Sequence, residues 1–220
     1  MDMNSGRCII IGAGDLTVGT IPMREDDFVI AVDGGLNYCG ILEIEPDLIV
    51  GDFDSVGKTG QQIVDSLKEQ IPDRIIQLNP MKDDTDMLYA IKHALQSGYR
   101  EFLIYGGTGG RFDHTFANIQ CLLYLKNNGA VGYLCDGEGM MLVIKNETIH
   151  FKQEMEGFLS LFSLGKKAVG VDISGMKYNL TDYTMTNDFP IGISNEFIGE
   201  KASVCVREGE LICMIRYAEG

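Results

Sequence analysis

Residues 46–55 read Pro-Asp-Leu-Ile-Val-Gly-Asp-Phe-Asp-Ser, a short apolar run followed at once by two aspartates. Similar apolar runs occur at Phe28–Val32, which precedes Asp33, and at Phe102–Tyr105, which precedes a glycine-rich loop. Amphipathic stretches separate these runs, and such alternation of strands and helices indicates an α/β unit with a mainly parallel sheet. Because ligands gather at the carboxyl ends of parallel strands, we expect the polar residues after the runs to form one site.

The two halves of the chain differ in the length and spacing of their apolar runs. In the first half we expect strands at Cys8–Ile11, Phe28–Val32, Leu48–Val50 and Phe102–Tyr105, and helices near Leu36–Leu42, Gln61–Gln70, Asp84–Gln96 and Phe112–Leu125. After residue 129 the runs become short, β-rich and separated by turn signals, at Val131–Cys135, Met140–Lys145, Thr148–Phe151, Phe158–Leu164, Ala168–Ile173, Ala202–Arg207 and Leu211–Tyr217. This pattern predicts a Rossmann-like α/β domain over residues 1–135 and an all-β sandwich over residues 136–220.

The composition narrows the class of protein. With 220 residues, of which 45% are hydrophobic, the chain can fill one large core or two small ones. A net charge of -14 argues against a nucleic-acid partner, because the phosphate backbone requires a basic face. The polar first residues and the short run Cys8–Ile11 suit neither a signal peptide nor a membrane span, so we expect a cytoplasmic protein without membrane contact. The six cysteines show no C-x-x-C pairing and are expected to be reduced core residues.

The first acidic motif contains Asp52 and Asp54 on either side of a phenylalanine. If the strand geometry continues, both carboxylates point to the same side, where they suit a hard cation such as Mg²⁺. The competing interpretation is an Asx turn that ends the strand without any metal.

The second acidic motif is Lys-Asp-Asp-Thr-Asp at residues 82–86. A helix is expected to begin near Asp84 or Thr85, with Asp83 as its N-cap, which explains one or two of the carboxylates but not three beside a lysine. Asp83 and Asp86 would share a helix face, where either suits a metal ion, and Lys82 could reach a phosphate group.

The third motif is the glycine-rich stretch Gly106–His114, which matches neither the P-loop nor the dinucleotide fingerprint. Its glycines and the following helix N-terminus offer N–H groups to phosphate oxygens, and Arg111 offers a bidentate contact. Asp113 could orient Arg111 or hold metal, and His114 is more typical of a helix start or a core than of a general base. Gly12-Ala13-Gly14-Asp15 is a weaker nucleotide signal. The residues expected to bind the nucleotide are Asp33, Gly34, Lys82, Gly106, Gly107, Thr108, Gly109, Gly110, Arg111 and Asp113.

With these motifs in this order, between Asp33 and Asn118, the chain resembles the thiamin pyrophosphokinase family, also called thiamine diphosphokinases. The spacing of all four motifs is specific, whereas any one alone would be weak. Ile193–Phe197 looks like the family's late substrate-binding segment. The resemblance implies an ATP- and Mg²⁺-binding catalytic domain over residues 1–135, a thiamin-binding sandwich over residues 136–220, and a homodimer.

The reaction that the resemblance implies is transfer of the pyrophosphoryl group of ATP to the hydroxyl of thiamin, which gives AMP and thiamin diphosphate. Mg²⁺ is the implied cofactor, with Asp52, Asp54, Asp83 and Asp86 as candidate ligands. The catalytic residues would be Asp54, Asp83, Asp86 and Arg111, and Ser194 and Asn195 would bind thiamin. The chain contains no tryptophan, so an aromatic contact to thiamin would come from Phe or Tyr.

Two other functions use the same residues. A Mg²⁺-dependent phosphohydrolase acting on nucleotides or thiamin phosphates would place water where thiamin attacks. A non-catalytic protein that binds nucleotide or thiamin would keep the pocket without chemistry, although such a binder needs fewer clustered carboxylates.

Overall fold

The computed structural model describes residues 6–53, 57–79 and 83–218. Asp54 and Lys82, two of the site residues named above, lie outside these ranges. The chain divides into two compact units, Met1–Gly137 and Glu138–Gly220, close to the expected boundary between residues 135 and 136. No helix in the described part of the chain is both long and apolar enough to cross a membrane.

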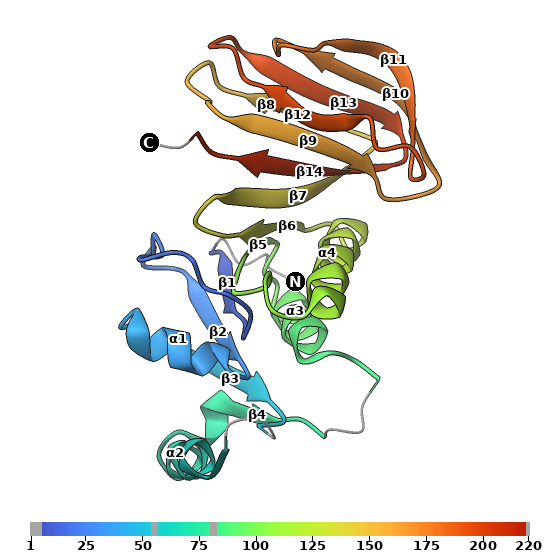
Figure 1. Ribbon diagram of the computed structural model, residues 1–220. Helices are drawn as coiled ribbons and strands as arrows, with labels where there is room; N and C mark the ends of the chain where they lie inside the picture. The colour runs from blue at the N-terminus through green and yellow to red at the C-terminus, as the bar shows by residue number, and fades with distance from the viewer. Residues whose placement is uncertain (1–5, 54–56, 80–82, 219–220) are drawn as a thin grey trace. The chain divides into compact units, whose positions relative to one another are not determined.

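The first unit is built on a parallel sheet with the strand order β6-β5-β1-β2-β3-β4 (Figure 1). Its strands are β1 Cys8–Ile11, β2 Phe28–Val32, β3 Leu48–Gly51, β4 Ile75–Gln77, β5 Glu101–Tyr105 and β6 Val131–Cys135. Its helices are α1 Gly35–Ile41, α2 Gly57–Gln70, α3 Asp86–Gln96 and α4 Phe112–Asn127, with a 3-10 turn at Pro72–Arg74. All the expected strands and helices of this unit are present, and β4 was missed because a three-residue strand shows no clear period.

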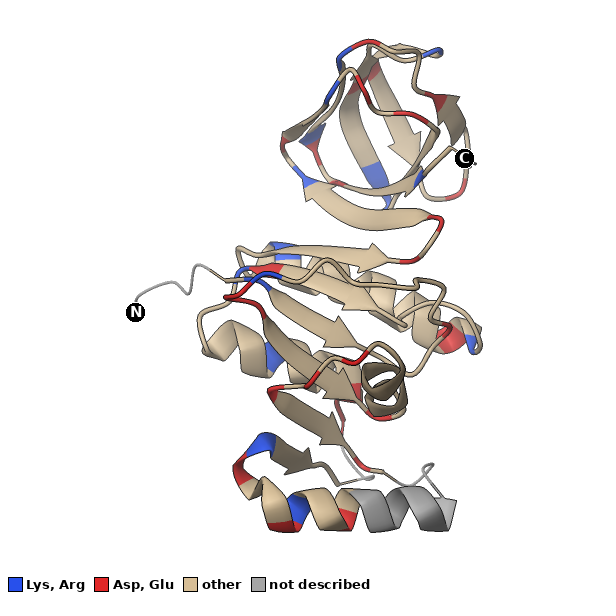
Figure 2. Cartoon of the chain, turned by 90° about the vertical axis from the view of Figure 1, so that its left-hand side faces the viewer, with Lys and Arg blue, Asp and Glu red and all other residues tan. Residues whose placement is uncertain are grey.

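Helices cover both faces of this sheet, as a parallel sheet requires. On one face a buried cluster joins the sheet to α1 and α2 through Ile9, Ile11, Val29, Ala31, Cys39, Ile49 and Val64. On the other face α3 and α4 pack together (Figure 1). The strands are almost free of charge, with only Glu101 carrying one, and the acidic residues lie mostly in loops and helices (Figure 2).

The strand order fixes where a ligand can bind. The chain runs outward from β1 to β4 and then returns to place β5 on the other side of β1. The loops after β1 and β5 therefore leave the sheet in opposite directions, which creates the crevice where ligands bind in open α/β sheets. The glycine-rich stretch that follows β5 lies at this crevice.

The second unit is a sandwich of two antiparallel sheets, β12-β9-β14-β7 and β11-β10-β13-β8. The strands are β7 Gly139–Lys145, β8 Thr148–Phe151, β9 Phe158–Ser163, β10 Lys167–Ser174, β11 Leu180–Thr186, β12 Gly192–Glu196, β13 Ala202–Glu208 and β14 Glu210–Arg216. Buried aliphatic residues such as Leu161, Val171, Val204 and Leu211 fill the space between the sheets. The expected fold class is confirmed, although β11 and β12 are too polar to stand out in the sequence.

All six cysteines are free thiols, and four of them are buried. Burial raises the pKa of the Cys39 thiol and of the Cys121 thiol to about 11, so both stay protonated at neutral pH. Of the six cysteines expected in the core, Cys135 and Cys205 are only half-buried.

Candidate active site

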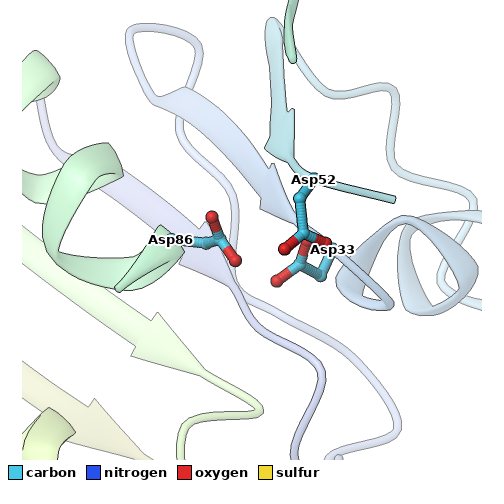
Figure 3. A group of neighbouring side chains, drawn as sticks. All are labelled: Asp33, Asp52 and Asp86. Carbon is cyan, nitrogen blue, oxygen red and sulfur yellow. The ribbon is translucent and has the colours of Figure 1, made fainter. Parts of the chain in front are cut away.

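Three aspartates meet at the carboxyl ends of the strands. Asp33 follows β2, Asp52 follows β3 and Asp86 is the first residue of α3. One oxygen of each carboxylate lies within 4.8 Å of the corresponding oxygen of the other two, and all three residues are half-buried. Figure 3 shows the carboxylates turned toward one another. We call Asp33, Asp52 and Asp86 the acidic group.

The backbone around the acidic group adopts uncommon conformations. Asp33 and Phe53 have φ angles of 49° and 59°, in the left-handed region that residues other than glycine rarely enter. The Asp33 N–H donates to the carbonyl of Val50 at 2.9 Å, which ties the end of β2 to the end of β3. A Cβ atom on Gly51 would lie 2.2 Å from Asp33 Oδ1, so glycine at this position leaves room for the Asp33 carboxylate. Left-handed residues of this kind are found at functional sites more often than elsewhere.

The start of α3 decides which acid of the second motif reaches the group. The N-cap is Thr85, whose Oγ1 accepts a hydrogen bond from the Leu88 N–H at 3.2 Å. The expectation that Asp83 caps the helix was wrong, because the chain becomes helical only after Thr85. Asp83 is exposed, and both oxygens of Asp84 accept from Lys92 Nζ at 2.7 Å. Of the two alternatives, Asp83 and Asp86, the structure thus brings Asp86 into the acidic group.

The donor set of the acidic group fits a divalent cation. It consists of carboxylate oxygens, the ligands that Mg²⁺ prefers, and three negative charges this close repel one another without a cation. Within the described residues, Asp33 Oδ1 and Asp86 Oδ1 are buried oxygens that accept no hydrogen bond, although both residues have other interactions.

The glycine-rich loop is anchored to the loop after β1. The N–H groups of Gly14 and Asp15 donate to the carbonyls of Gly106 and Thr108 at 2.7 and 2.8 Å. The two backbones approach so closely that a Cβ on Gly14 would lie 2.3 Å from the Thr108 carbonyl oxygen. The weak glycine signal after β1 was therefore informative, because these glycines permit the close contact.

Arg111 precedes α4 and is paired with Asp113. Arg111 Nε and Nη2 donate to the two Asp113 oxygens at 3.1 and 2.5 Å. This pairing raises the pKa of the Arg111 guanidinium and lowers the pKa of the Asp113 carboxyl. Both side chains are exposed, so an incoming anion can reach Arg111. His114 is also exposed rather than part of the core.

A cavity of about 710 Å³ joins these features. The acidic group, Gly12–Asp15, Arg111, Asp113, His114 and the glycines at 106, 107, 109 and 110 line it. Its volume falls within the usual range for small-molecule sites, about 300–1,000 Å³. Among the described residues that we expected to bind the nucleotide, Gly34 and Thr108 do not line it.

Two family models match the chain. Residues 22–133 match the thiamin pyrophosphokinase catalytic domain, and residues 146–211 match the thiamin pyrophosphokinase vitamin B1 binding domain. The chain belongs to the thiamin pyrophosphokinase family. This confirms the family and the enzyme class, ATP:thiamin diphosphotransferase, that the motifs predicted, and the hydrolase and non-catalytic alternatives are not favoured.

Individual family members agree with this assignment. Thiamine pyrophosphokinase from Bacillus subtilis is 30% identical over 192 residues, which cover 85% of this chain and 86% of that protein. Thiamine pyrophosphokinase 1 from Oryza sativa subsp. japonica is 27% identical over 210 residues, covering 84% and 77%. The crystal structure of the Bacillus subtilis protein aligns with a TM-score of 0.84 at 25% identity, over 98% of this chain and 100% of that one.

Ser194 and Asn195, the residues expected to bind thiamin, lie in the segment that matches the vitamin B1 binding model. Their surroundings differ from each other. Asn195, on β12, is 7% exposed; its Oδ1 accepts from the N–H groups of Tyr178 and Glu196, and its Nδ2 donates to the Tyr178 carbonyl at 2.7 Å. Ser194 is exposed, with a left-handed φ of 56°. Asn195 thus fastens a neighbouring turn, whereas the Ser194 side chain is accessible.

Proposed function

We propose that this thiamin pyrophosphokinase carries out Mg²⁺-dependent transfer of the pyrophosphoryl group from ATP to the hydroxyl of thiamin in the cavity of the α/β unit. The observation that supports this most strongly is the meeting of the acidic group, the glycine-rich loop and Arg111 around one cavity. Phosphoryl-type transfer requires mainly positioning and charge neutralisation, and these are the parts it needs.

The acidic group would hold the metal ion. Asp33, Asp52 and Asp86 are the proposed ligands, and bound Mg²⁺ would neutralise charge on the polyphosphate. Asp33, which the motifs suggested as a nucleotide ligand, is reassigned to the metal on the basis of its distance to the other two carboxylates. Asp54 remains a predicted ligand from its position after Phe53. Asp83 is left out because it is exposed and outside the group.

The nucleotide phosphates would lie against the glycine-rich loop. The first N–H groups of α4 have no partner within the helix, and the helix dipole adds positive potential at the same end. Arg111 would exchange Asp113 for a phosphate oxygen, which it can contact through two N–H groups. Lys82 stays a predicted phosphate ligand from the sequence.

In the proposed reaction the thiamin hydroxyl oxygen forms a bond to the β-phosphorus of ATP. The bond between this phosphorus and the oxygen that bridges to the α-phosphorus breaks, and AMP leaves with that oxygen. We assign the hydroxyl proton to one carboxylate of the acidic group, because a carboxylate can act as a general base.

The remaining predictions concern the rest of the molecule. We infer that the β-sandwich supplies the thiamin site and that the chain forms a homodimer in the cytoplasm. The second unit exposes Tyr178, Phe189, Ile191 and Ile193, an apolar set that would suit either thiamin or a second copy. Light scattering during gel filtration would test the dimer, with a monomer at working concentration as the contradicting result.

The function itself is tested by following phosphorus species by NMR. The protein is incubated with ATP, Mg²⁺ and thiamin, alongside reactions that lack thiamin or contain EDTA. We expect AMP and thiamin diphosphate to form together, only when thiamin and free Mg²⁺ are present. Inorganic phosphate or ADP formed without thiamin would contradict the proposal and favour a hydrolase.

A further inference from the structure

Asn118 is a buried polar residue on α4 that the function above does not use. Its side chain is 8% exposed and its Nδ2 donates to the carbonyl oxygen of Gly107 at 2.8 Å. A carbonyl oxygen can only accept, so the nitrogen of the amide must face it, which settles the orientation of the side chain. Asn118 also lines the cavity.

Gly107 occupies the centre of the anchored loop. Three consecutive carbonyls are held there: that of Gly106 by the Gly14 N–H, that of Gly107 by Asn118, and that of Thr108 by the Asp15 N–H. The two outer anchors are backbone N–H groups. The middle anchor is the one that depends on a particular side chain.

Holding a carbonyl also sets the direction of the next N–H group. In a trans peptide the C=O of one residue and the N–H of the next point in opposite directions. The bond from Asn118 to the Gly107 carbonyl therefore turns the Thr108 N–H away from Asn118. Gly107 is closely surrounded, because a Cβ at this position would lie 2.5 Å from Leu134 Cδ1 and 3.2 Å from Ile104 Cγ2.

We propose that Asn118 is a positioning residue for the nucleotide, which holds the backbone of the glycine-rich loop at Gly107, a residue that lines the cavity, in the conformation that binds the triphosphate. This inference rests on the proposed function for the identity of the ligand. A purely structural asparagine would satisfy a buried carbonyl and affect stability alone. A positioning asparagine changes nucleotide affinity in protein that is fully folded.

The test uses Asn118→Asp, which keeps the shape of the side chain and replaces the donor by an oxygen. Binding of Mg²⁺ and α,β-methylene-ATP, which cannot be cleaved at the transferred bond, is measured by calorimetry without thiamin. We expect the Kd to rise by about tenfold or more at neutral pH, because a carboxylate oxygen would face the Gly107 carbonyl. Misfolded protein lowers the measured stoichiometry and leaves the Kd of the folded fraction unchanged.

The matched control is Asn128→Asp at the C-cap of the same helix. Asn128 Nδ2 also donates to a backbone carbonyl, that of Tyr124 at 2.8 Å, but at the exposed far end of α4. This variant undergoes the same chemical change away from the cavity, and its Kd should stay within about twofold of the wild-type value. Equal weakening in both variants would overturn the proposal.

A pH series tests whether the loss of affinity follows the charge of the new carboxylate, and the neutral variant described next separates loss of the donor from direct repulsion of the polyphosphate. The carboxyl introduced by Asn118→Asp regains a donor when it is protonated, so the ratio of variant to wild-type Kd should fall toward one as the pH drops from about 8 to about 5. The other charged or titratable side chains that line the cavity, those of Asp15, Asp84, the acidic group, Arg111, Asp113 and His114, are the same in both proteins, so the ratio isolates the effect of the substitution.

A neutral variant, Asn118→Ser, completes the test. It should weaken nucleotide binding at every pH and raise the KM for ATP while leaving the KM for thiamin unchanged. Wild-type affinity in both Asn118 variants would overturn the inference, as would a ratio that does not change with pH. Absence of AMP formation by the wild-type protein would instead contradict the proposed function, and the calorimetric comparison would still decide the role of Asn118.

Discussion

Polar side chains near strand ends have different surroundings in the two units. In the α/β unit, Asp33, Asp52 and Asp86 converge on one another around a cavity. In the β-sandwich, Asn195 is also polar and follows Ser194, whose backbone is left-handed like that of Asp33. The side-chain amide of Asn195 is nevertheless hydrogen-bonded to the backbone of Tyr178 and Glu196. The amide of Asn195 is therefore hydrogen-bonded to the backbone of its own unit, whereas the carboxylates of the acidic group lie close together at the cavity.

Two ion pairs, one from each unit, differ in their exposure to solvent. Arg7 and Asp27 of the α/β unit form a pair with two hydrogen bonds, and their side chains are only 9% and 0% exposed. Arg207 and Asp182 of the sandwich form a pair with side chains that are 55% and 66% exposed. Removing one partner of a buried pair leaves an uncompensated charge inside the protein, whereas the remaining charge of an exposed pair is solvated by water.

Among the substitutions that test the contrast between the acidic group and Asn195, Asp86→Asn is expected to have the largest effect on activity. Loss of one carboxylate from the acidic group should lower kcat/KM by about a thousandfold, because charge neutralisation at the polyphosphate is weakened. The same variant should be at least as stable as the wild type in EDTA, since removing one of three crowded charges relieves repulsion. Steady-state kinetics and thermal melts measure the two effects.

Asp83→Asn is the natural comparison, because it changes the exposed acid of the same motif. We expect its loss of kcat/KM to be at least about tenfold smaller than that of Asp86→Asn. Equal losses in the two variants would place Asp83 in the metal site and contradict the assignment drawn from the start of α3.

The next largest effect concerns the buried ion pair. Asp27→Asn should lower the free energy of unfolding by about 3 kcal/mol at neutral pH, because it leaves the buried Arg7 without a counter-charge. Asp182→Asn in the sandwich should give no change beyond experimental error. Urea unfolding of both variants tests the contrast, and equal effects would remove the distinction between the buried pair and the exposed pair.

The pH dependence follows from the pKa of Asp27. Burial raises this pKa, but the hydrogen bonds from the Arg7 side chain and the Arg24 N–H outweigh burial, so the pKa lies below its ordinary value. A carboxyl with a lowered folded pKa contributes stability above its unfolded pKa and loses it as the pH falls through the folded pKa. The stability difference between wild type and Asp27→Asn should therefore shrink as the pH falls from about 5 to about 2. A difference that stays constant over this range would contradict the role of the charge.

The sequence was sufficient to place the site at one edge of the sheet. Apolar strands alternating with helices bring the strand ends together, so the acids after β2 and β3 and the glycines after β5 had to be neighbours. It could not choose between Asp83 and Asp86, because the choice depends on the single turn at which α3 begins. The hydroxyl of Thr85 decides that turn, and three candidate caps stand in a row at residues 83–85.

The sequence was less informative about conformations and distant partners. The left-handed backbone of Asp33 depends on a hydrogen bond to Val50, seventeen positions away. The bonds of Asn195 to Tyr178 and of Asn118 to Gly107 likewise join residues that are distant in sequence. Local propensity contains no information on such contacts, so a buried asparagine and a ligand-binding one look alike until the fold is known.

The smallest of the three effects tests the sandwich side of the comparison. Asn195→Asp replaces the donor to the Tyr178 carbonyl by a carboxylate oxygen, and we expect the free energy of unfolding to fall by about 2 kcal/mol at neutral pH. Ser194→Ala removes only an exposed hydroxyl, so its stability should change by no more than about 0.5 kcal/mol. Chemical unfolding and the KM for thiamin are measured for both variants. If Asn195 fastens the turn at Tyr178, its substitution alters stability more than that of Ser194; if Asn195→Asp raises the KM for thiamin and leaves stability unchanged, the residue binds ligand and the contrast between the two units fails.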